Sequence, residues 1–319
     1  MLPIDAVIPC YNAAAFVGEA IESVLAQTRP VRRVIAVDDA SGDGTAEVVE
    51  RFAAAGHPVE CVRMRENGGP AAARNLGVCS GSAPLVAFLD ADDRWLPGHC
   101  EAVAGLLERH PRAVLAFGGV EERERGPMEE ARLAAGEPLD AFWALAFDNP
   151  VPQSAAVVRR DAFVAAGGYD PTLRYAEDYD LWLRLRLAGP MVRSAAATCV
   201  RRAHPGQASR DGARMFRSGW RVRAQARRRF AETAASFALD RYDAALCAAF
   251  DRDLRYAWES RSRATFQAAL EGAPPEVRGI AEVAERWRRR AYLWPAWRVA
   301  VGVWDRVPVP LRARLRPAV

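Results

Sequence analysis

Short apolar runs alternate with amphipathic segments along the first ninety residues of the chain. Residues 4–9 form a largely apolar run, and the apolar residues between Phe16 and Leu25 then recur at helical spacing. Asn12 lies between the two segments, where a helix N-cap is expected. The alternation continues with predicted strands at residues 34–37, 59–62 and 85–89, and predicted helices at residues 45–54 and 70–78. This order predicts an α/β fold with a mostly parallel sheet flanked by helices.

The second half of the chain has a different character. A further strand is expected at residues 155–158 and a helix at residues 177–187, and beyond Cys199 the sequence becomes rich in arginine and tryptophan. Residues 201–230 contain ten arginines and a single aspartate. We therefore predict an α/β domain over residues 1–205 and a helical C-terminal region over residues 206–319.

Composition limits the class of protein. The chain has 319 residues, of which 50% are hydrophobic and 26% charged, as expected of a globular protein with a substantial core. It has no apolar run long enough to span a membrane and no signal-peptide pattern at its start, which predicts a cytoplasmic protein. The six cysteines are scattered without a CxxC pair, which predicts reduced thiols.

All forty-four basic residues are arginine, because the chain contains no lysine. A Walker A loop and a pyridoxal Schiff base both need a lysine, so neither can be present. The nearest candidate for a GxGxxG motif, residues 42–47, has glutamate at its sixth position. Any phosphate group must therefore be bound in another way.

Acidic residues follow two of the predicted strands. Asp38 and Asp39 end one strand, and Asp90, Asp92 and Asp93 end another. A single acid after a strand is usually a turn or cap residue, but clustered carboxylates repel one another unless a cation or an arginine joins them. Ligands of parallel α/β sheets bind at this carboxyl edge, so we expect a binding site there.

Five motifs occur in series along residues 3–205: VIPCYNAAAFVGEAIESVLAQT, VDDASGDGT, ENGGPAAARNLG, FLDADD and GGYDPTLRYAEDYDLWLRL. In order and spacing they resemble glycosyltransferase family 2, whose members have the GT-A fold. The resemblance implies an inverting glycosyltransferase that uses a nucleoside-diphosphate sugar, with a UDP-sugar the favoured donor. Residues 206–319 lie outside the resemblance.

The resemblance also implies which residues hold the nucleotide of the donor. It places Pro9, Tyr11 and Asp39 at the base and ribose, and an aromatic ring and a carboxylate suit these groups chemically. Arg74 matches the arginine that family members carry near the nucleotide. An ion pair of Arg74 with Asp39 or Asp90 inside the protein is an equal alternative.

Asp90-Ala91-Asp92 matches the DxD motif of the family. By this resemblance Asp92 is the direct ligand of Mg²⁺ or Mn²⁺, and Asp90 reaches the ribose or a metal-bound water. A hard divalent cation with oxygen ligands binds a diphosphate and stabilises the charge that develops as it leaves. His204 stands where many family members have a histidine at the metal or diphosphate, although a single histidine is often only structural.

Glu177 and Asp178 match the ED motif of the family, in which the aspartate is the general base. Asp180 is the alternative base if the alignment is off by two residues. Acids in the first turn of a helix are also favoured by the helix dipole alone. Trp182 and Leu183 fit the buried face of this helix, so we expect them in the core.

The acceptor is not identified by the sequence, although polysaccharide, glycolipid or other glycoconjugate assembly is the expected context. The arginine-rich stretch is either a solvated helix face or a basic patch that approaches an anionic acceptor or the inner face of the membrane. No nucleic-acid-binding motif accompanies the charge, so nucleic acid is not expected as a partner. The alternatives are a metal-dependent nucleotidyl- or phosphotransferase and a non-catalytic module that binds nucleotide sugars.

Overall fold

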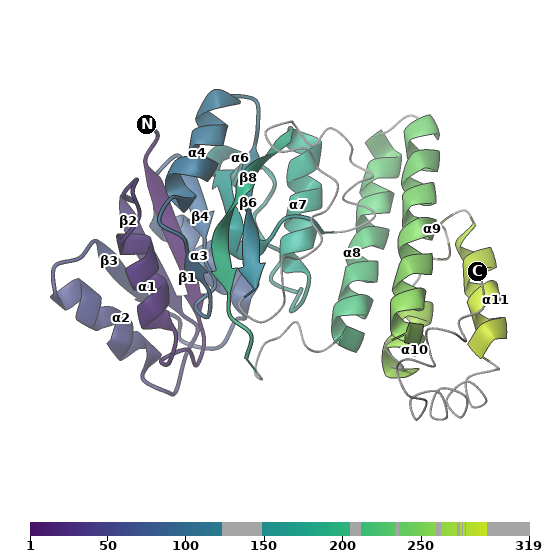
Figure 1. The fold of residues 1–319 in the computed structure, drawn as a ribbon, viewed down its shortest axis with the longest axis horizontal. Coiled ribbons are helices and arrows are strands. Elements are labelled where there is room, and N and C mark those ends of the chain that lie inside the picture. Colours follow the sequence, from purple (N-terminus) through teal and green to yellow (C-terminus); the bar gives the residue numbers. More distant parts are fainter. Residues whose placement is uncertain are drawn as a thin grey trace, which may run out of the picture.

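An eight-stranded mixed sheet forms the centre of the α/β part of the chain (Figure 1). The computed structural model describes residues 1–122, 149–204, 212–233, 236–259, 263–272, 275, 277 and 279–291. The strands are β1 Ile4–Cys10, β2 Arg33–Asp38, β3 Val59–Arg63, β4 Leu85–Phe88, β5 Arg94–Trp95, β6 Leu115–Glu122, β7 Ala156–Arg159 and β8 Met191–Arg201. Their order in the sheet is β3-β2-β1-β4-β7-β6-β8-β5.

The first four strands of this order are mutually parallel, as the sequence predicts. The far side of the sheet is different, because β7 pairs antiparallel with both β4 and β6, and β5 pairs antiparallel with β8. Strands β5, β6 and β8 have no counterpart among the elements predicted from sequence. The sheet is therefore mixed, with its parallel half at the N-terminal end of the chain.

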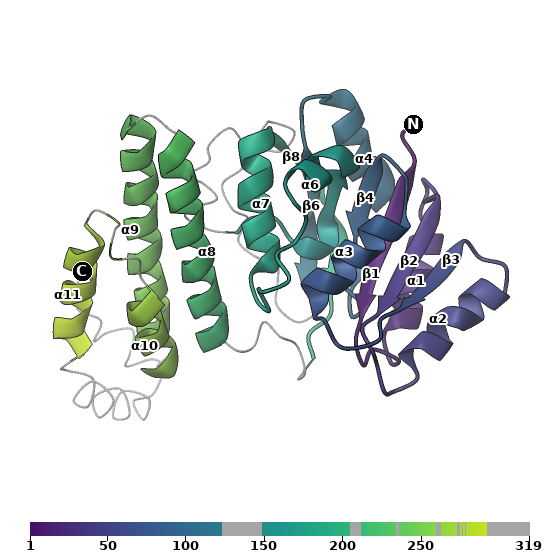
Figure 2. The same ribbon diagram turned by 180° about the vertical axis from the view of Figure 1, so that it is seen from behind.

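Helices cover both faces of the sheet. Those of the α/β part are α1 Val17–Leu25, α2 Thr45–Ala54, α3 Pro70–Ser80, α4 His99–Arg109, α6 Arg160–Ala165 and α7 Glu177–Ala188. Alternate side chains of β1 point to opposite faces, so Ile8 packs with α1 and α4 while Val7 packs with α3 and α7. Figures 1 and 2 show these two helical layers from opposite sides.

Four further helices follow the sheet: α8 Gly212–Thr233, α9 Ser236–Glu259, α10 Arg263–Gly272 and α11 Ile280–Ala291. The large buried side chains of Trp220, Phe250 and Trp287 belong to the same hydrophobic cluster as Trp182 of α7. The described helices of the C-terminal region thus continue the core on the α7 side of the sheet. None of the described helices is long and apolar enough to cross a membrane.

One local prediction is wrong. Asn12 does not cap the first helix, which begins only at Val17. Its backbone is in the left-handed region, with φ of 48°, and its side-chain oxygen accepts a hydrogen bond from the N–H of Gly42 at 3.0 Å. Asn12 therefore joins the loops that follow β1 and β2. The six cysteines, all within the described residues, are free thiols in the structure.

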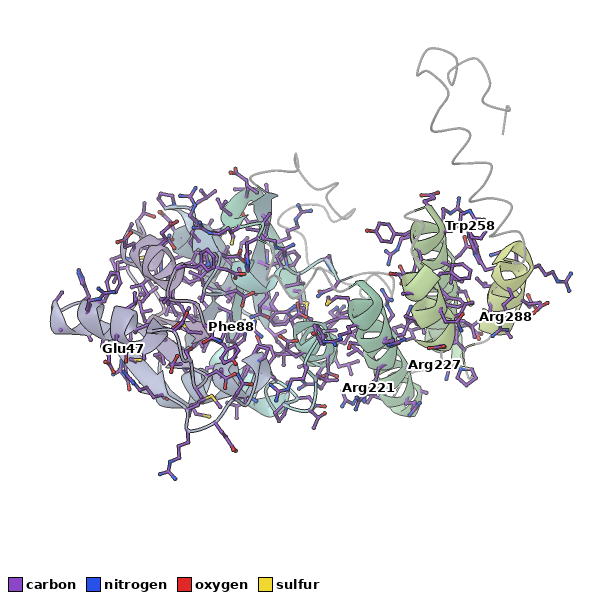
Figure 3. All side chains as sticks on the ribbon, turned by 90° about the horizontal axis from the view of Figure 1, so that it is seen from below. Glu47, Phe88, Arg221, Arg227, Trp258 and Arg288 are labelled. Carbon is purple, nitrogen blue, oxygen red and sulfur yellow. The ribbon has the colours of Figure 1, made fainter. Side chains whose placement is uncertain are left out.

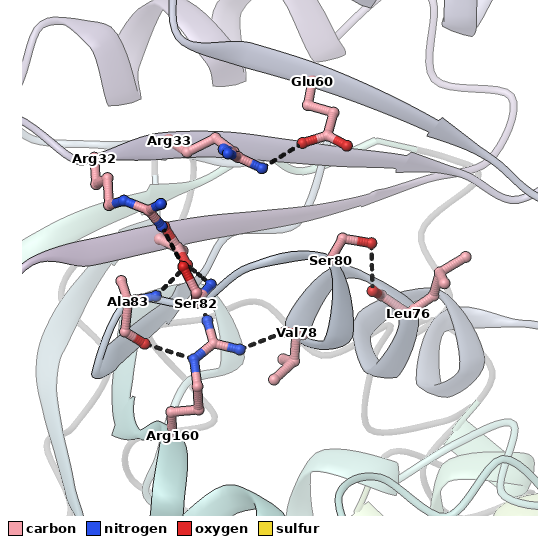
Figure 4. A network of polar contacts seen from close by, with 10 residues as sticks. Arg32, Arg33, Glu60, Leu76, Val78, Ser80, Ser82, Ala83 and Arg160 are labelled. Atoms are coloured by element: carbon pink, nitrogen blue, oxygen red, sulfur yellow. Dashed lines mark hydrogen bonds and ion pairs between the residues drawn. The ribbon is translucent and has the colours of Figure 1, made fainter.

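A buried carboxylate secures the amino edge of the sheet. Asp5 on β1 is fully buried and accepts hydrogen bonds from the backbone N–H groups of Ser82 and Ala83 at 2.8 and 2.7 Å. The guanidinium of Arg160 lies 2.9 Å from the same carboxylate and also donates to the carbonyl of Ala83 (Figure 4). A buried charge satisfied in this way fixes β1, the turn before β4 and α6 relative to one another.

Candidate active site

The carboxyl ends of β1, β2 and β4 meet at one edge of the sheet, because these strands are parallel neighbours. Asp38 is the last residue of β2 and pairs in register with Cys10 of β1, while Asp90 follows β4 by two residues. Pro9 is half-buried near the end of β1, and the ring of Tyr11 just beyond it is 55% exposed. The structure thus brings the predicted nucleotide-binding residues to the same edge.

The carboxylate of Asp39 is buried and held by a glycine loop. Its two oxygens accept hydrogen bonds from the backbone N–H groups of Gly68 and Gly69, at 2.7 and 2.8 Å. Gly69 has a φ of +87°, a backbone conformation that strains any residue with a Cβ atom, so glycine is favoured there. A carboxylate has about four lone-pair directions. The loop therefore fixes the orientation of Asp39 and leaves acceptor capacity for a ligand.

Arg74 connects two separate parts of the site. Its Nη2 donates to Asp90 at 2.7 Å and its Nη1 to Glu177 at 2.8 Å, and the guanidinium lies over the ring of Tyr169. Burial lowers the pKa of Arg74, but the carboxylates of Asp90 and Glu177 outweigh it and raise the pKa. The alternative of an internal ion pair is confirmed for Asp90, while Asp39 binds the glycine loop instead.

Asp92 and His204 face each other. The Nε2 atom of His204 lies 2.8 Å from Oδ2 of Asp92, and its ring is 5.2 Å from that of Phe16. No cluster of three or more His, Cys, Asp or Glu side chains suited to a metal occurs in the described part of the chain. A carboxylate and an imidazole nevertheless fit a divalent cation that takes its remaining ligands from water and a diphosphate.

Asp93 connects the segments that carry Asp92 and His204. Its carboxylate accepts hydrogen bonds from the hydroxyl of Ser154 at 2.6 Å and from the backbone N–H of Arg202 at 3.1 Å. Burial, with the nearby carboxylates of Asp90 and Asp92, raises the pKa of Asp93 to about 7. Asp93 thereby ties the segment after β8, which carries His204, to the end of β4.

Asp178 lies in the first turn of α7, next to Glu177. Its carboxylate accepts hydrogen bonds from the backbone N–H of Tyr179 at 2.7 Å and from the side-chain amide of Asn149 at 3.1 Å. Burial raises the pKa of Asp178 to about 6, and the negative charge of Glu177 adds to the increase. Such a carboxyl group changes its protonation state close to neutral pH and suits general-base chemistry.

Asp180, the alternative base, points in another direction. Its carboxylate binds Arg184 at 2.7 Å and Arg229 of α8 at 3.1 Å, and only 2% of the residue is exposed. The structure therefore favours Asp178 as the residue able to meet a substrate. Trp182 and Leu183 are buried in the core, as predicted.

Two side chains of the site carry no signal in the sequence. Asn149 contacts Asp178, and Ser154 contacts both the backbone of Asp90 and the carboxylate of Asp93. Both belong to the short segment before β7, whose composition is that of an ordinary loop. Only the antiparallel pairing of β7 with β4 places this segment beside the acids.

Comparison with known proteins gives the family. The family model described as "Glycosyl transferase family 2" matches residues 5–163. The chain is also 28% identical over 194 residues to a putative teichuronic acid biosynthesis glycosyltransferase of Bacillus subtilis, covering 58% of this chain and 73% of the relative. Through its N-terminal half the chain belongs to glycosyltransferase family 2, which confirms the resemblance seen in the sequence.

Other curated relatives are matched over a smaller part of their length, from 43% in one case to 66% in another. For several of these relatives the match covers less than two thirds of their length. They therefore show the family of the matched region of this chain.

Solved structures confirm the GT-A fold. Residues 1–349 of Staphylococcus aureus TarS, crystallised with UDP-GlcNAc, match with a TM-score of 0.72 over 92% of both chains, at 16% identity. A mannosyltransferase from Pyrobaculum calidifontis in complex with GDP-Man and Mn²⁺ matches with a TM-score of 0.57 over 96% of this chain and 88% of its own, at 19% identity. Both carry nucleotide-sugar donors, and one contains a divalent metal.

Proposed function

We propose that the chain is a metal-dependent, inverting glycosyltransferase that moves a sugar from a nucleoside-diphosphate sugar to a hydroxyl acceptor. The observation that carries the proposal is the contact of Arg74 with both Asp90 and Glu177. It couples the strand end that bears the DxD motif to the helix turn that bears Asp178. A donor-binding edge and a general base are thereby held beside one another, as a single displacement requires.

The donor nucleotide would lie along the ends of β1 and β2. Tyr11 would stack on the base, Asp39 would accept from the base or ribose, and Pro9 would line the floor. Arg74 and Glu177 would set the position of Asp90 beneath the ribose. A UDP-sugar is the favoured donor, since a carboxylate accepts the imide N–H of uracil and the TarS complex contains UDP-GlcNAc.

Asp92 and His204 would hold the metal, Mg²⁺ or Mn²⁺. When bound, such a cation neutralises the diphosphate and stabilises the charge on the leaving group. The side chains of Asp92 and His204, now 2.8 Å apart, would have to move apart so that both can bind the same cation. Asp93 keeps the two ligands in reach of each other through its hydrogen bond to the backbone of Arg202.

Asp178 would accept the proton of the acceptor hydroxyl as that oxygen attacks the anomeric carbon. The bond to the diphosphate oxygen breaks in the same step, so the configuration inverts. The hydrogen bonds from Asn149 and the N–H of Tyr179 orient the carboxylate. Such a base contributes about 10²- to 10⁴-fold to the rate.

The setting we propose is glycoconjugate assembly on the cytoplasmic side of the membrane. The names of the curated relatives support this setting, since they include teichuronic acid, amylovoran and succinoglycan biosynthesis. Those products are the ones for which the relatives are named.

Calorimetric titration of UDP, dTDP and GDP into the full chain, with Mn²⁺ and then with EDTA, tests the proposal. Metal-dependent binding of one nucleotide supports the site and names the donor class. Absence of binding by all three would refute it. Product analysis separates the rival functions, because release of a sugar phosphate without glycosyl transfer indicates a phosphotransferase, and binding without any turnover indicates a non-catalytic module.

A further inference from the structure

Arg174 lies beside the glycine loop that holds Asp39, although the two residues are far apart in the sequence. Its Nη1 atom donates to the side-chain oxygen of Asn67 at 3.2 Å. Its guanidinium also fills the position that a Cβ atom would take at Gly69. The N–H of Gly69 in turn binds Oδ2 of Asp39 at 2.8 Å. The guanidinium of Arg174 and the carboxylate of Asp39 therefore contact the same glycine.

The backbone that carries Arg174 is held in place on its N-terminal side. The carboxylate of Asp170 accepts hydrogen bonds from the N–H and the hydroxyl of Thr172, at 2.9 and 2.7 Å. The carbonyl of Asp170 accepts from the N–H of Leu173 at 3.1 Å, and the side chain of Leu173 is buried in the core. Arg174 itself is exposed. A side chain on a fixed backbone loses less conformational freedom when it binds a ligand.

Arg174 has hydrogen-bond donors to offer a ligand. Among the residues that the structure describes, no carboxylate lies within ion-pair distance of its guanidinium. A guanidinium has five N–H donors, and the contact with Asn67 uses one of them. Arg74 differs, because its two terminal nitrogens already bind Asp90 and Glu177. Of these two arginines, Arg174 is therefore the one whose charge is not balanced by a contacting carboxylate.

A carboxylate and a guanidinium at one glycine match one edge of particular nucleobases. Uracil, thymine and guanine each present a ring N–H next to a carbonyl oxygen, and proteins read a single nucleobase by hydrogen bonds to this edge. A carboxylate accepts the N–H and a guanidinium donates to the carbonyl. Cytosine and adenine have a lone pair at that ring position, which the carboxylate of Asp39 would repel.

We infer that Arg174 is a specificity-determining residue, which donates to a carbonyl of the donor nucleobase beside the N–H that Asp39 accepts. The inference rests on the proposed function and deepens it by naming a second residue that reads the nucleobase. The donors it admits are sugars linked to UDP, dTDP or GDP, and those it rejects are linked to CDP or ADP. An anionic group of the acceptor is the less suitable ligand, because Asn67 and Gly69, which Arg174 contacts, belong to the loop that orients Asp39.

The test is calorimetric titration of UDP, 2-thio-UDP and 4-thio-UDP into the full chain with Mn²⁺. Sulfur accepts hydrogen bonds more weakly than oxygen. The analogue with sulfur at the carbonyl that faces Arg174 should therefore bind about tenfold more weakly than UDP, as expected for one charge-assisted hydrogen bond. The analogue that carries this penalty identifies the carbonyl. If the chain prefers GDP, 6-thio-GDP is compared with GDP in the same way.

The variant Arg174→Met removes all the donors of this side chain. It should bind UDP about tenfold more weakly than the parent chain, and it should bind UDP and the penalised analogue alike, because the contact that sulfur weakens is absent. The control Arg288→Met removes the same charge from an exposed position of α11. Figure 3 shows Arg288 at the opposite end of the molecule from Glu47 of α2. This control should keep both the affinity and the sulfur penalty of the parent chain.

Equal affinity of the parent chain for the oxygen and sulfur nucleotides would overturn the inference. The same sulfur penalty in Arg174→Met as in the parent chain would also overturn it, since a merely structural role of Arg174 leaves that penalty unchanged. So would normal nucleotide affinity in Arg174→Met with a raised KM for the acceptor, which places the residue at the acceptor. Metal-dependent nucleotide binding that Arg174→Met leaves unchanged refutes this inference alone. Absence of binding of every nucleoside diphosphate to the parent chain refutes the proposed function and the inference together.

Discussion

Arg74 and Glu177 are 103 residues apart in the sequence, yet Nη1 of the arginine lies 2.8 Å from Oε1 of the glutamate. The same guanidinium binds Asp90, so one buried cation joins α3, the end of β4 and the start of α7. The DxD motif and the helix turn that carries the candidate base are thus joined through one buried cation.

Replacing Arg74 by methionine should destabilise the fold strongly. The substitution leaves Asp90 and Glu177 without their shared cation, and removing one partner of a buried ion pair costs about 3–5 kcal/mol. Arg33→Gln is the control, because Arg33 lies 2.7 Å from Glu60 in a half-exposed pair, and ion pairs in contact with solvent contribute about 0–1 kcal/mol. Urea denaturation measures the free energy of unfolding of both variants. Equal decreases in that free energy would contradict the bridging role of Arg74.

Asp178→Asn should strongly reduce transfer and preserve binding of the donor nucleotide. The loss expected for a missing general base is about 10²- to 10⁴-fold in kcat. Asp161→Asn, at an exposed position of α6, serves as the control and should leave kcat unchanged. Transfer at the normal rate by Asp178→Asn would remove Asp178 from the mechanism.

The raised pKa of Asp178 predicts two pH dependences. Because the base must be ionised, kcat should rise with pH to a plateau, with a midpoint near 6. The ordinary pKa of an aspartate is about 3.9, so the folded chain holds this proton more tightly than the unfolded chain. The unfolding free energy should therefore fall as pH rises from about 4 to about 6, and this fall should be absent in Asp178→Asn. Urea denaturation at several pH values in this range measures the unfolding free energy of the parent chain and of Asp178→Asn.

Tyr179→Phe should lower kcat without changing the affinity for the donor. Arg223 of α8 donates to the hydroxyl of Tyr179 at 3.2 Å, and Tyr179 directly follows Asp178. Loss of this hydrogen bond should make the position of Asp178 in the first turn of α7 less well fixed. The value of kcat should therefore fall several-fold, up to about tenfold, for one removed hydrogen bond. The midpoint of the pH profile should also shift. Tyr256→Phe, at an exposed position of α9, is the control. An unchanged pH profile would show that the contact is only structural.

Asp92→Ala and His204→Ala should each raise the Mn²⁺ concentration needed for half-maximal nucleotide binding. Asp92→Ala should have the larger effect, since an anionic oxygen is the preferred ligand of a hard cation. His57→Ala removes an exposed histidine elsewhere and should have none. Calorimetry at several metal concentrations measures the effect. Metal-independent binding in all three variants and in the parent chain would remove the metal from the proposal.

The sequence by itself determined the elements of the N-terminal half and the strand ends on which the acids lie. Helix Thr45–Ala54 has the predicted bounds, and the predicted strands at residues 4–9 and 34–37 correspond to β1 and β2. These features follow from the periodicity of a few neighbouring residues and from the rule that acids after parallel strands share one edge. The family resemblance also needed only local motifs and their spacing.

Tertiary structure decided which of these residues meet. The contact of Asp92 with His204 spans 112 residues, and the choice between Asp178 and Asp180 depends on how α7 packs against α8. Strand β7 pairs antiparallel with β4, and this pairing brings Asn149 and Ser154 to the site. Such contacts depend on packing between distant segments, and a local pattern of polar and apolar positions carries no information about that packing.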